Sequence, residues 1–456
     1  MSSEVELKRT LGSLMLWGLG VGYVISGMYF GWNLGLAEGG TYGLAIATAF
    51  VIVMYVTFTL SYTELACSMP SAGGAFVYAN KALGKDLGFL AGMAQNIEFI
   101  FCPPAIAAAI GAYFMLFLPE TWTSGEYEII GFVITQESLV VIAIAIVAYA
   151  IFTIINILGV ESAAAVELVV TVIAVAGLLL FASVCLPSFE LKNLKTNALP
   201  NGYWGIFAAI PFAMWFFLAI ECLANVAEET IDPQRKMVIG FGSAIFTLVV
   251  LCLLTFSSSV GVGGWEKVVY NASGEAVDSP LPLAIEALLG SQHLIYKLLI
   301  GIGLIGLIAS FHGIILAAGR ATFEFGRIGY APKILGKIHY KFKTPSNALL
   351  INALIGIIAL LSGKTGDIIT IACFGALTLY IISMISLFKL RKEHPNMDRP
   401  FKVPIYPLFP SLAIIISSIA LISMIYFNKE VFLVYLGILM VSYLWFLYVG
   451  KKRFSE

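Results

Sequence analysis

The sequence predicts an all-α polytopic membrane protein with twelve transmembrane helices, on the strength of its composition, its long apolar runs and the distribution of its basic residues. The 456 residues are 60% hydrophobic and 12% charged, whereas soluble domains carry about 25% charged residues. This composition excludes a soluble enzyme. The net charge of −1 gives no attraction for nucleic acid, so the expected partners are the lipid bilayer and a small molecule.

Twelve segments are long and apolar enough to cross a bilayer, which takes about twenty residues each. The first, third and eighth exceed a simple span and need a tilt, a break or an exposed extension. The expected spans are Leu11–Leu36, Tyr42–Met69, Gly84–Leu118, Ser138–Leu158, Ser162–Leu186, Tyr203–Ala227, Val238–Gly261, Leu294–Phe325, Ser346–Ser362, Asp367–Leu390, Ile405–Tyr426 and Val431–Val449.

The basic residues fix the orientation. With twelve spans, twenty of the 26 lysines and arginines fall on the side of the two termini and six on the other. The positive-inside rule therefore predicts a multi-pass protein of the bacterial cytoplasmic (inner) membrane with both termini in the cytoplasm. One membrane transport domain, residues 1–456, is expected. The six cysteines are scattered singly without metal-ligand spacing, so we expect no metal site and no cofactor.

Two spans are expected to break near the middle of the bilayer. The first is rich in glycine around Ile25–Met28, and the sixth contains Pro211 followed by Trp215 and Glu221. Irregular backbone in a membrane survives where it lines a cavity, so these segments indicate a substrate site. Close packing of small residues between helices is the alternative explanation for the glycines of the first span. The two spans are five apart, the spacing of two inverted five-helix repeats.

Seven short motifs, in order along the chain, resemble the amino acid–polyamine–organocation superfamily of transporters. They are Ile25-Ser26-Gly27-Met28-Tyr29, Tyr62-Thr63-Glu64-Leu65 with Pro70–Phe76, Asn156-Ile157-Leu158-Gly159-Val160, Glu228-Glu229 with Pro233-Gln234-Arg235, Gly326–Pro332, Thr344–Ala348 and Arg399–Pro404. The resemblance implies a LeuT-type fold with repeats at residues 11–187 and 203–391 and two trailing helices at 405–450. It also implies alternating-access transport, by secondary active or facilitative transport, and not enzymatic activity.

Within this superfamily the chain is most similar to the ethanolamine permeases, through Gly27–Trp32, Met54–Phe58 and Ile97–Ala107. It departs from superfamily patterns at two positions. Ala219 stands where a glycine is frequent at the sixth-helix break, and Ala174 falls where some proton-coupled members carry a lysine. The coupling ion, H⁺ or Na⁺, therefore stays open.

Ethanolamine is a cation without a carboxylate, so the protein must supply the balancing negative charge. Four carboxylates lie within predicted spans, where charged groups are functional candidates. Glu98 is the preferred counter-ion, because Pro103-Pro104 are expected to interrupt its helix one turn later. Glu221 is expected to organise the break or respond to protons, Glu64 to tie helices together, and Glu167 to hold a proton.

Aromatic rings at the breaks could bind the ammonium through cation–π contacts, and Trp215 aligns with a gating aromatic of related exchangers. His312 is a ligand or relay candidate, with a hydrogen-bonded structural role as its alternative. The predicted substrate-binding residues are Ile25, Ser26, Gly27, Met28, Tyr29, Gln95, Glu98, Trp215, Phe216, Ala219, Glu221 and His312. The predicted gating or proton-site residues are Glu64, Glu167, Trp215, Glu228, Glu229 and Arg327.

The expected function is transport of a small cationic amine, ethanolamine first. A permease for an amino acid, choline or a polyamine is the alternative within the superfamily. A membrane nutrient sensor is a more distant alternative. The sequence does not indicate an oligomeric state.

Overall fold

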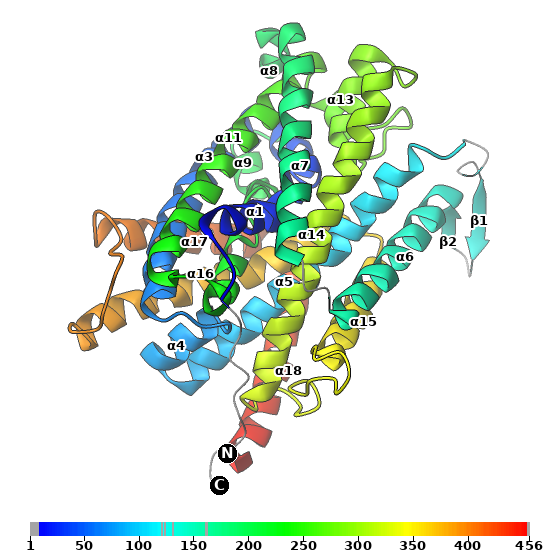
Figure 1. Ribbon diagram of the computed structural model, residues 1–456. Helices are drawn as coiled ribbons and strands as arrows, with labels where there is room; N and C mark the ends of the chain where they lie inside the picture. Colours follow the sequence, from blue (N-terminus) through cyan, green and yellow to red (C-terminus); the bar gives the residue numbers. More distant parts are fainter. Residues whose placement is uncertain (1–8, 120–121, 123–124, 130–131, 160–162, 454–456) are drawn as a thin grey trace.

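Apolar helices dominate the structure, because a chain in lipid must satisfy its backbone hydrogen bonds within each segment. The computed structural model describes residues 9–119, 122, 125–129, 132–159 and 163–453 (Figure 1). The first half contains α1 (Ser13–Val24), α2 (Ser26–Tyr29), α3 (Leu34–Ser68), α4 (Ala75–Leu83), α5 (Lys85–Met115), β1 (Glu126–Ile129), β2 (Phe132–Thr135), α6 (Gln136–Leu158), α7 (Ala163–Cys185), η2 (Leu186–Ser188) and α8 (Leu191–Lys195). The second half contains α9 (Trp204–Ala208), α10 (Ile210–Trp215), η3 (Ile220–Glu229), α11 (Pro233–Gly263), α12 (Glu266–Val269), α13 (Pro280–Leu289), α14 (Leu294–Arg327), α15 (Ser346–Leu360), α16 (Thr365–Glu393), α17 (Leu408–Phe427) and α18 (Lys429–Arg453).

Ten segments of the described chain are long and apolar enough to cross a membrane, and α1 and α15 are shorter apolar helices. Together they account for the twelve predicted spans, so the prediction of an all-helical polytopic membrane fold is confirmed. The first two spans are joined through α3, whose backbone is non-helical only at Gly40 (φ 62°). The predicted start of the fifth span at Ser162 lies outside the described residues.

The loops contain short elements that the sequence reading missed. β1 and β2 pair antiparallel with Glu126 opposite Thr135. Figure 1 shows α8 and α13, from segments predicted to face outward, at one end of the bundle. It shows α4, predicted to face the cytoplasm, at the other end.

The first span is interrupted where predicted, and a serine from another helix fills the gap. The amide of Ser26 donates to Ser310 Oγ on α14 (3.0 Å), and that hydroxyl donates to the carbonyl of Gly22 (2.6 Å). An uninterrupted helix would join Ser26 directly to Gly22. Ser310 therefore satisfies both backbone groups at the break, as a membrane interior requires.

The sixth span is also interrupted where predicted, between the end of α10 at Trp215 and the start of η3 at Ile220. Ala219 has a left-handed backbone (φ 75°, ψ 13°) and is fully buried. This conformation costs a residue other than glycine roughly 1–2 kcal/mol. It explains why glycine is frequent at this position in the superfamily that the sequence resembles.

The paired prolines do not interrupt α5, contrary to the sequence-based expectation. The helix runs from Lys85 to Met115 with Pro103 and Pro104 inside it. Glu98 is placed instead by a close crossing with α16. A Cβ on Gly375 would lie 2.6 Å from the carbonyl oxygen of Ala94 and 2.9 Å from the amide nitrogen of Glu98.

The strain at Ala219 is testable with a pair of substitutions. Ala219→Gly should preserve transport with an equal or higher Tm, because glycine adopts positive φ without steric cost. Ala219→Val should lower the Tm and abolish transport, because a β-branched residue fits this conformation poorly. Thermal unfolding of the purified variants checks both, and a stable, active Ala219→Val would contradict the strained break.

Candidate functional site

Two carboxyl groups, from Glu98 on α5 and Glu221 on η3, meet beside the interrupted sixth span. The two carboxyls are close enough to interact electrostatically and the amide of Ala219 lies near Glu98, but neither contact is a well-formed hydrogen bond. Both side chains are buried. Two carboxylates in contact repel each other strongly in a medium of low dielectric constant. The pair therefore carries at most one charge unless a cation lies beside it.

Polar atoms around this pair have no protein partner among the described residues. These atoms, which make no well-formed hydrogen bond, are both carboxyl oxygens of Glu98, Oε1 of Glu221, both amide atoms of Gln95 and Nε1 of Trp215. Gln95 lies on α5 one turn before Glu98, and both it and Trp215 are buried. Buried polar groups are normally satisfied. Unpartnered atoms of Gln95, Glu98 and Glu221 beside the second break are what a site for a polar ligand requires.

Two tyrosines that the sequence reading assigned no role complete the polar cluster. Tyr380 on α16 donates to Oε2 of Glu221 (3.0 Å), and its hydroxyl lies 3.2 Å from that of Tyr55 on α3. The Tyr55 ring packs against Phe217 with centroids 5.4 Å apart. The carboxyl pair thus has aromatic rings beside it, the combination that recognises organic cations.

The residues of the first break lie against the sixth span. A Cβ on Gly27 would lie 2.2 Å from the carbonyl oxygen of Trp215, so only glycine fits there. Ile25 and Met28 are buried, and the amide of Met28 donates to the carbonyl of Ile25 (3.0 Å). The two interruptions therefore meet, as the sequence predicted.

The aromatic candidates near the breaks take different positions. The Trp215 ring packs edge-on against Phe30 (centroids 5.3 Å apart) and lies next to Gly31. Phe216 stacks on Trp32 instead, with centroids 5.5 Å apart. Tyr29 points away from the carboxyl pair, since its hydroxyl donates to the carbonyl of Ala174 on α7 (2.7 Å).

Glu167 and His312 lie together, and the structure shows no contact between them and the carboxyl pair. Nδ1 of His312 on α14 is 3.8 Å from Oε2 of Glu167 on α7. His312 was predicted among the substrate-binding residues, and the structure groups it with a proton-site candidate.

Glu64 lies in an ion-pair network that joins α3 to the last turn of α16 and to the chain after it. Nε of Arg391 donates to its Oε1 (2.8 Å), and the amide of Val403 donates to its Oε2 (2.7 Å). Arg399 lies 3.4 Å from the same carboxylate. A buried carboxylate with these partners holds helices together.

At the end of the site that the basic residues predict to face the cytoplasm, the structure has a contact that the sequence did not predict. Arg320 on α14 pairs with Glu229 (2.8 Å), whereas Arg327 pairs with Glu324 on its own helix (2.8 Å). Glu228 accepts the amide of Ala72 (2.9 Å). We call Arg320–Glu229 and Glu228–Ala72 the cytoplasmic latch.

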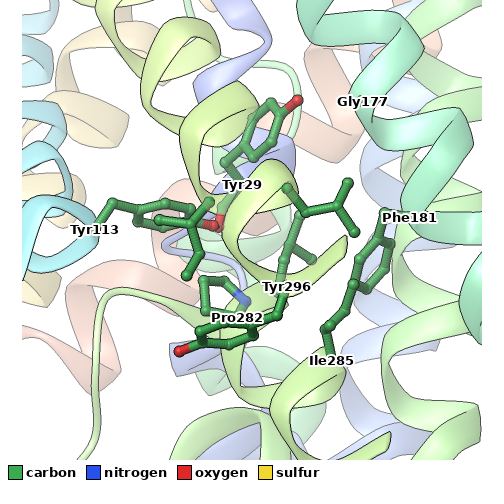
Figure 2. Close-up of a pocket in the computed structure, with 10 residues that line it drawn as sticks. Tyr29, Tyr113, Gly177, Phe181, Pro282, Ile285 and Tyr296 are labelled. Carbon is green, nitrogen blue, oxygen red and sulfur yellow. The ribbon is translucent and has the colours of Figure 1, made fainter. Parts of the chain in front are cut away.

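The opposite end is closed by tyrosines and by α13. Tyr113 donates to the carbonyl of Tyr29 (2.8 Å). Figure 2 shows these two rings, with Pro282, Ile285 and Tyr296, around a cavity of only about 10 Å³. Nearby, Thr365 donates to Asp278 (2.7 Å). Burial raises the pKa of the Asp278 carboxyl to about 6, and the Thr365 hydrogen bond opposes the rise. Contacts between helices therefore lie at both ends of the site in this structure.

The sequence contains little that would predict a role for Tyr55, Tyr380, Ser310 or Arg320. Tyr55 falls in a segment that carried the subfamily resemblance, so its position was marked without a role. Tyr380, Ser310 and Arg320 are single polar residues on apolar helices, and only packing shows what they contact. A like-charged pair such as Glu98 and Glu221, 123 positions apart in the chain, has no local pattern that would reveal it.

Two interrupted spans that meet around buried polar groups are typical of secondary transporters. The family profile described as amino acid permease matches residues 11–449. The chain therefore belongs to the amino acid permease family of the superfamily that the sequence motifs indicated.

Curated relatives align along most of their length. An uncharacterised transporter of Rhizobium meliloti (strain 1021) is 29% identical, covering 91% of this chain and 87% of that protein. The branched-chain amino acid permease BcaP of Bacillus subtilis (strain 168) is 27% identical, covering 99% and 95%. The methylthioribose transporter of the same bacterium is 25% identical, covering 90% and 87%. Substrates thus vary among proteins similar to this one.

The cytoplasmic latch predicts a labelling difference. In a chain whose only cysteine is Cys222, buried beside Glu221, Arg320→Gln should increase reaction with an impermeant maleimide applied from the cytoplasmic side. A partly exposed ion pair contributes up to about 1 kcal/mol, so the increase should be roughly two- to fivefold. The matched control Arg327→Gln breaks only the pair within α14, and equal labelling of both variants would refute the latch.

Proposed function

We propose that this chain transports a small organic cation without a carboxylate, ethanolamine first, across the cytoplasmic membrane by alternating access. The observation that carries the proposal is the Glu98–Glu221 pair, buried beside the second break with unpartnered oxygens. An ammonium group placed between the two carboxyls would offset their repulsion and donate to oxygens that lack partners. Charge-assisted hydrogen bonds of this kind are among the strongest in proteins.

The first break also favours a substrate without a carboxylate. In a carrier of zwitterions, amides freed by an interrupted helix suit the substrate carboxylate. Here the amide of Ser26 is engaged by Ser310 (3.0 Å), and that of Met28 by the carbonyl of Ile25 (3.0 Å). An amino acid would bring a second negative group to a site that already contains two carboxyls. The unpartnered amide of Gln95 suits a substrate hydroxyl instead.

Transport of a neutral amino acid is the second candidate, and the relatives favour it. BcaP of Bacillus subtilis carries the name of a branched-chain amino acid permease. In that case Glu98 and Glu221 would hold the amino group and share a proton, and a closure of the site would expose further amides. Competition between substrates distinguishes the two candidates.

The test is uptake of radiolabelled ethanolamine by proteoliposomes, with unlabelled leucine, serine, choline and putrescine as competitors. Excess leucine and serine should leave ethanolamine uptake unchanged. Glu98→Gln should reduce uptake at least about tenfold, because removing one partner of a buried charge pair costs roughly 2–5 kcal/mol.

Glu430→Gln is the matched control, because it removes an exposed carboxylate on α18, away from both breaks, and should transport normally. Thermal unfolding shows whether each variant is folded. Full uptake by a folded Glu98→Gln, or complete inhibition by leucine, would reject the amine-cation proposal.

A further inference from the structure

A second pair of titratable groups lies against the first break, separate from the carboxyl pair. Glu167 on α7 is buried, and its Oε2 lies 3.8 Å from Nδ1 of His312 on α14. Its other oxygen, Oε1, has no hydrogen-bond partner among the described residues. An unpartnered carboxyl oxygen in the membrane interior beside an imidazole is unfavourable unless a proton is shared between the groups.

The unpartnered oxygen lies directly beside α1. A Cβ on Gly22 would lie only 2.5 Å from Oε1 of Glu167 and 2.7 Å from Oγ1 of Thr171. Gly22 is also the residue whose carbonyl binds Ser310 at the break (2.6 Å). One turn of α1 therefore contacts both the pair on α7 and α14 and the hydroxyl that bridges the break. Movement of α1 must change the surroundings of Glu167.

We propose that Glu167 and His312 form a proton-binding pair that senses the position of α1, so that uptake is driven by an inward proton gradient. With α1 placed as in this structure, the pair holds a proton between the carboxyl and the imidazole. When α1 moves, Gly22 no longer covers Oε1 of Glu167, water reaches the pair and the proton is released. Binding that differs between conformations is what allows a gradient to drive transport.

Other titratable groups nearby do not replace this pair. From α1, Tyr23 faces Glu167, and a Cβ on Gly313 would lie 2.7 Å from its ring. Arg320 of α14 and Cys222 and Glu229 of η3 interact with Tyr23, and Arg320 is already paired with Glu229. From α6, Phe152 lies beside His312, with ring centroids 6.0 Å apart. Of these groups, His312 alone lies within ion-pair distance of Glu167 in the described chain.

This pair is distinct from the lysine device of the superfamily. That lysine would fall on Ala174, seven residues or about two helical turns from Glu167. In this structure the carbonyl of Ala174 accepts the hydroxyl of Tyr29 (2.7 Å). The proposed proton site depends only on Glu167, His312 and Gly22. The proposal therefore does not depend on which substrate the carboxyl pair binds.

The test compares accumulation with exchange in proteoliposomes, with labelled ethanolamine and labelled leucine as parallel probes. A pH gradient of one unit should drive up to about tenfold accumulation in the wild-type protein for one coupled proton. Glu167→Gln and His312→Gln should lose this accumulation but keep counterflow exchange, which needs no gradient. Glu430→Gln should keep both, and Glu167→Asp should keep accumulation with a shifted pH profile.

Three outcomes would overturn the proposal: accumulation that persists in both variants, accumulation that follows a sodium gradient alone, or accumulation and exchange that fall together. If neither labelled probe is taken up, NMR of the protein without substrate tests the Glu167–His312 pair. In protein labelled with ¹⁵N-histidine, the signal missing from His312→Gln belongs to His312, one of four histidines. The chemical shift of this signal at fixed pH should change in Glu167→Gln, and an unchanged signal would refute the pair.

Discussion

Two helix interruptions inside a lipid-exposed bundle impose the constraint on which the rest of the structure depends. Each interruption frees backbone groups that water cannot reach, so other helices must satisfy them. At the first, Ser310 bridges Ser26 and Gly22 (3.0 and 2.6 Å). At the second, the amide of Ala219 faces the carboxyl of Glu98. The need to satisfy these backbone groups therefore places polar side chains from α5 and α14 at the two breaks.

The contacts at the two breaks connect the proposed substrate site with α1, the element proposed to move. The carboxyl pair lies at the second break, and the Glu167–His312 pair lies one turn before the first. Gly27 packs on the carbonyl of Trp215, where a Cβ would approach to 2.2 Å. The two interrupted spans therefore cannot shift independently. A cation that stabilises one arrangement of the carboxyl pair would bias the position of α1, which in turn alters the surroundings of Glu167.

Much of this arrangement could be predicted from the sequence, because its cause is local. Twelve apolar runs, the glycines near Ile25–Met28 and the residues after Pro211 specify spans and breaks by composition alone. The contacts across helices could not be predicted in the same way. Nothing near Tyr380 indicates that its hydroxyl reaches Glu221, and Pro103-Pro104 suggested a break where α5 continues. Such contacts depend on which helix faces are paired, as with Gly375 against Glu98.

We propose that the Glu98–Glu221 pair binds the substrate ammonium, and a structure determined with bound ethanolamine is the decisive measurement. The substrate nitrogen should lie about 2.7–3.0 Å from a carboxyl oxygen of each residue. The substrate hydroxyl should lie toward Gln95. A nitrogen held instead by carbonyls of the first break, with Glu98 bonded only to protein groups, would rule out the carboxyl pair as the ammonium site.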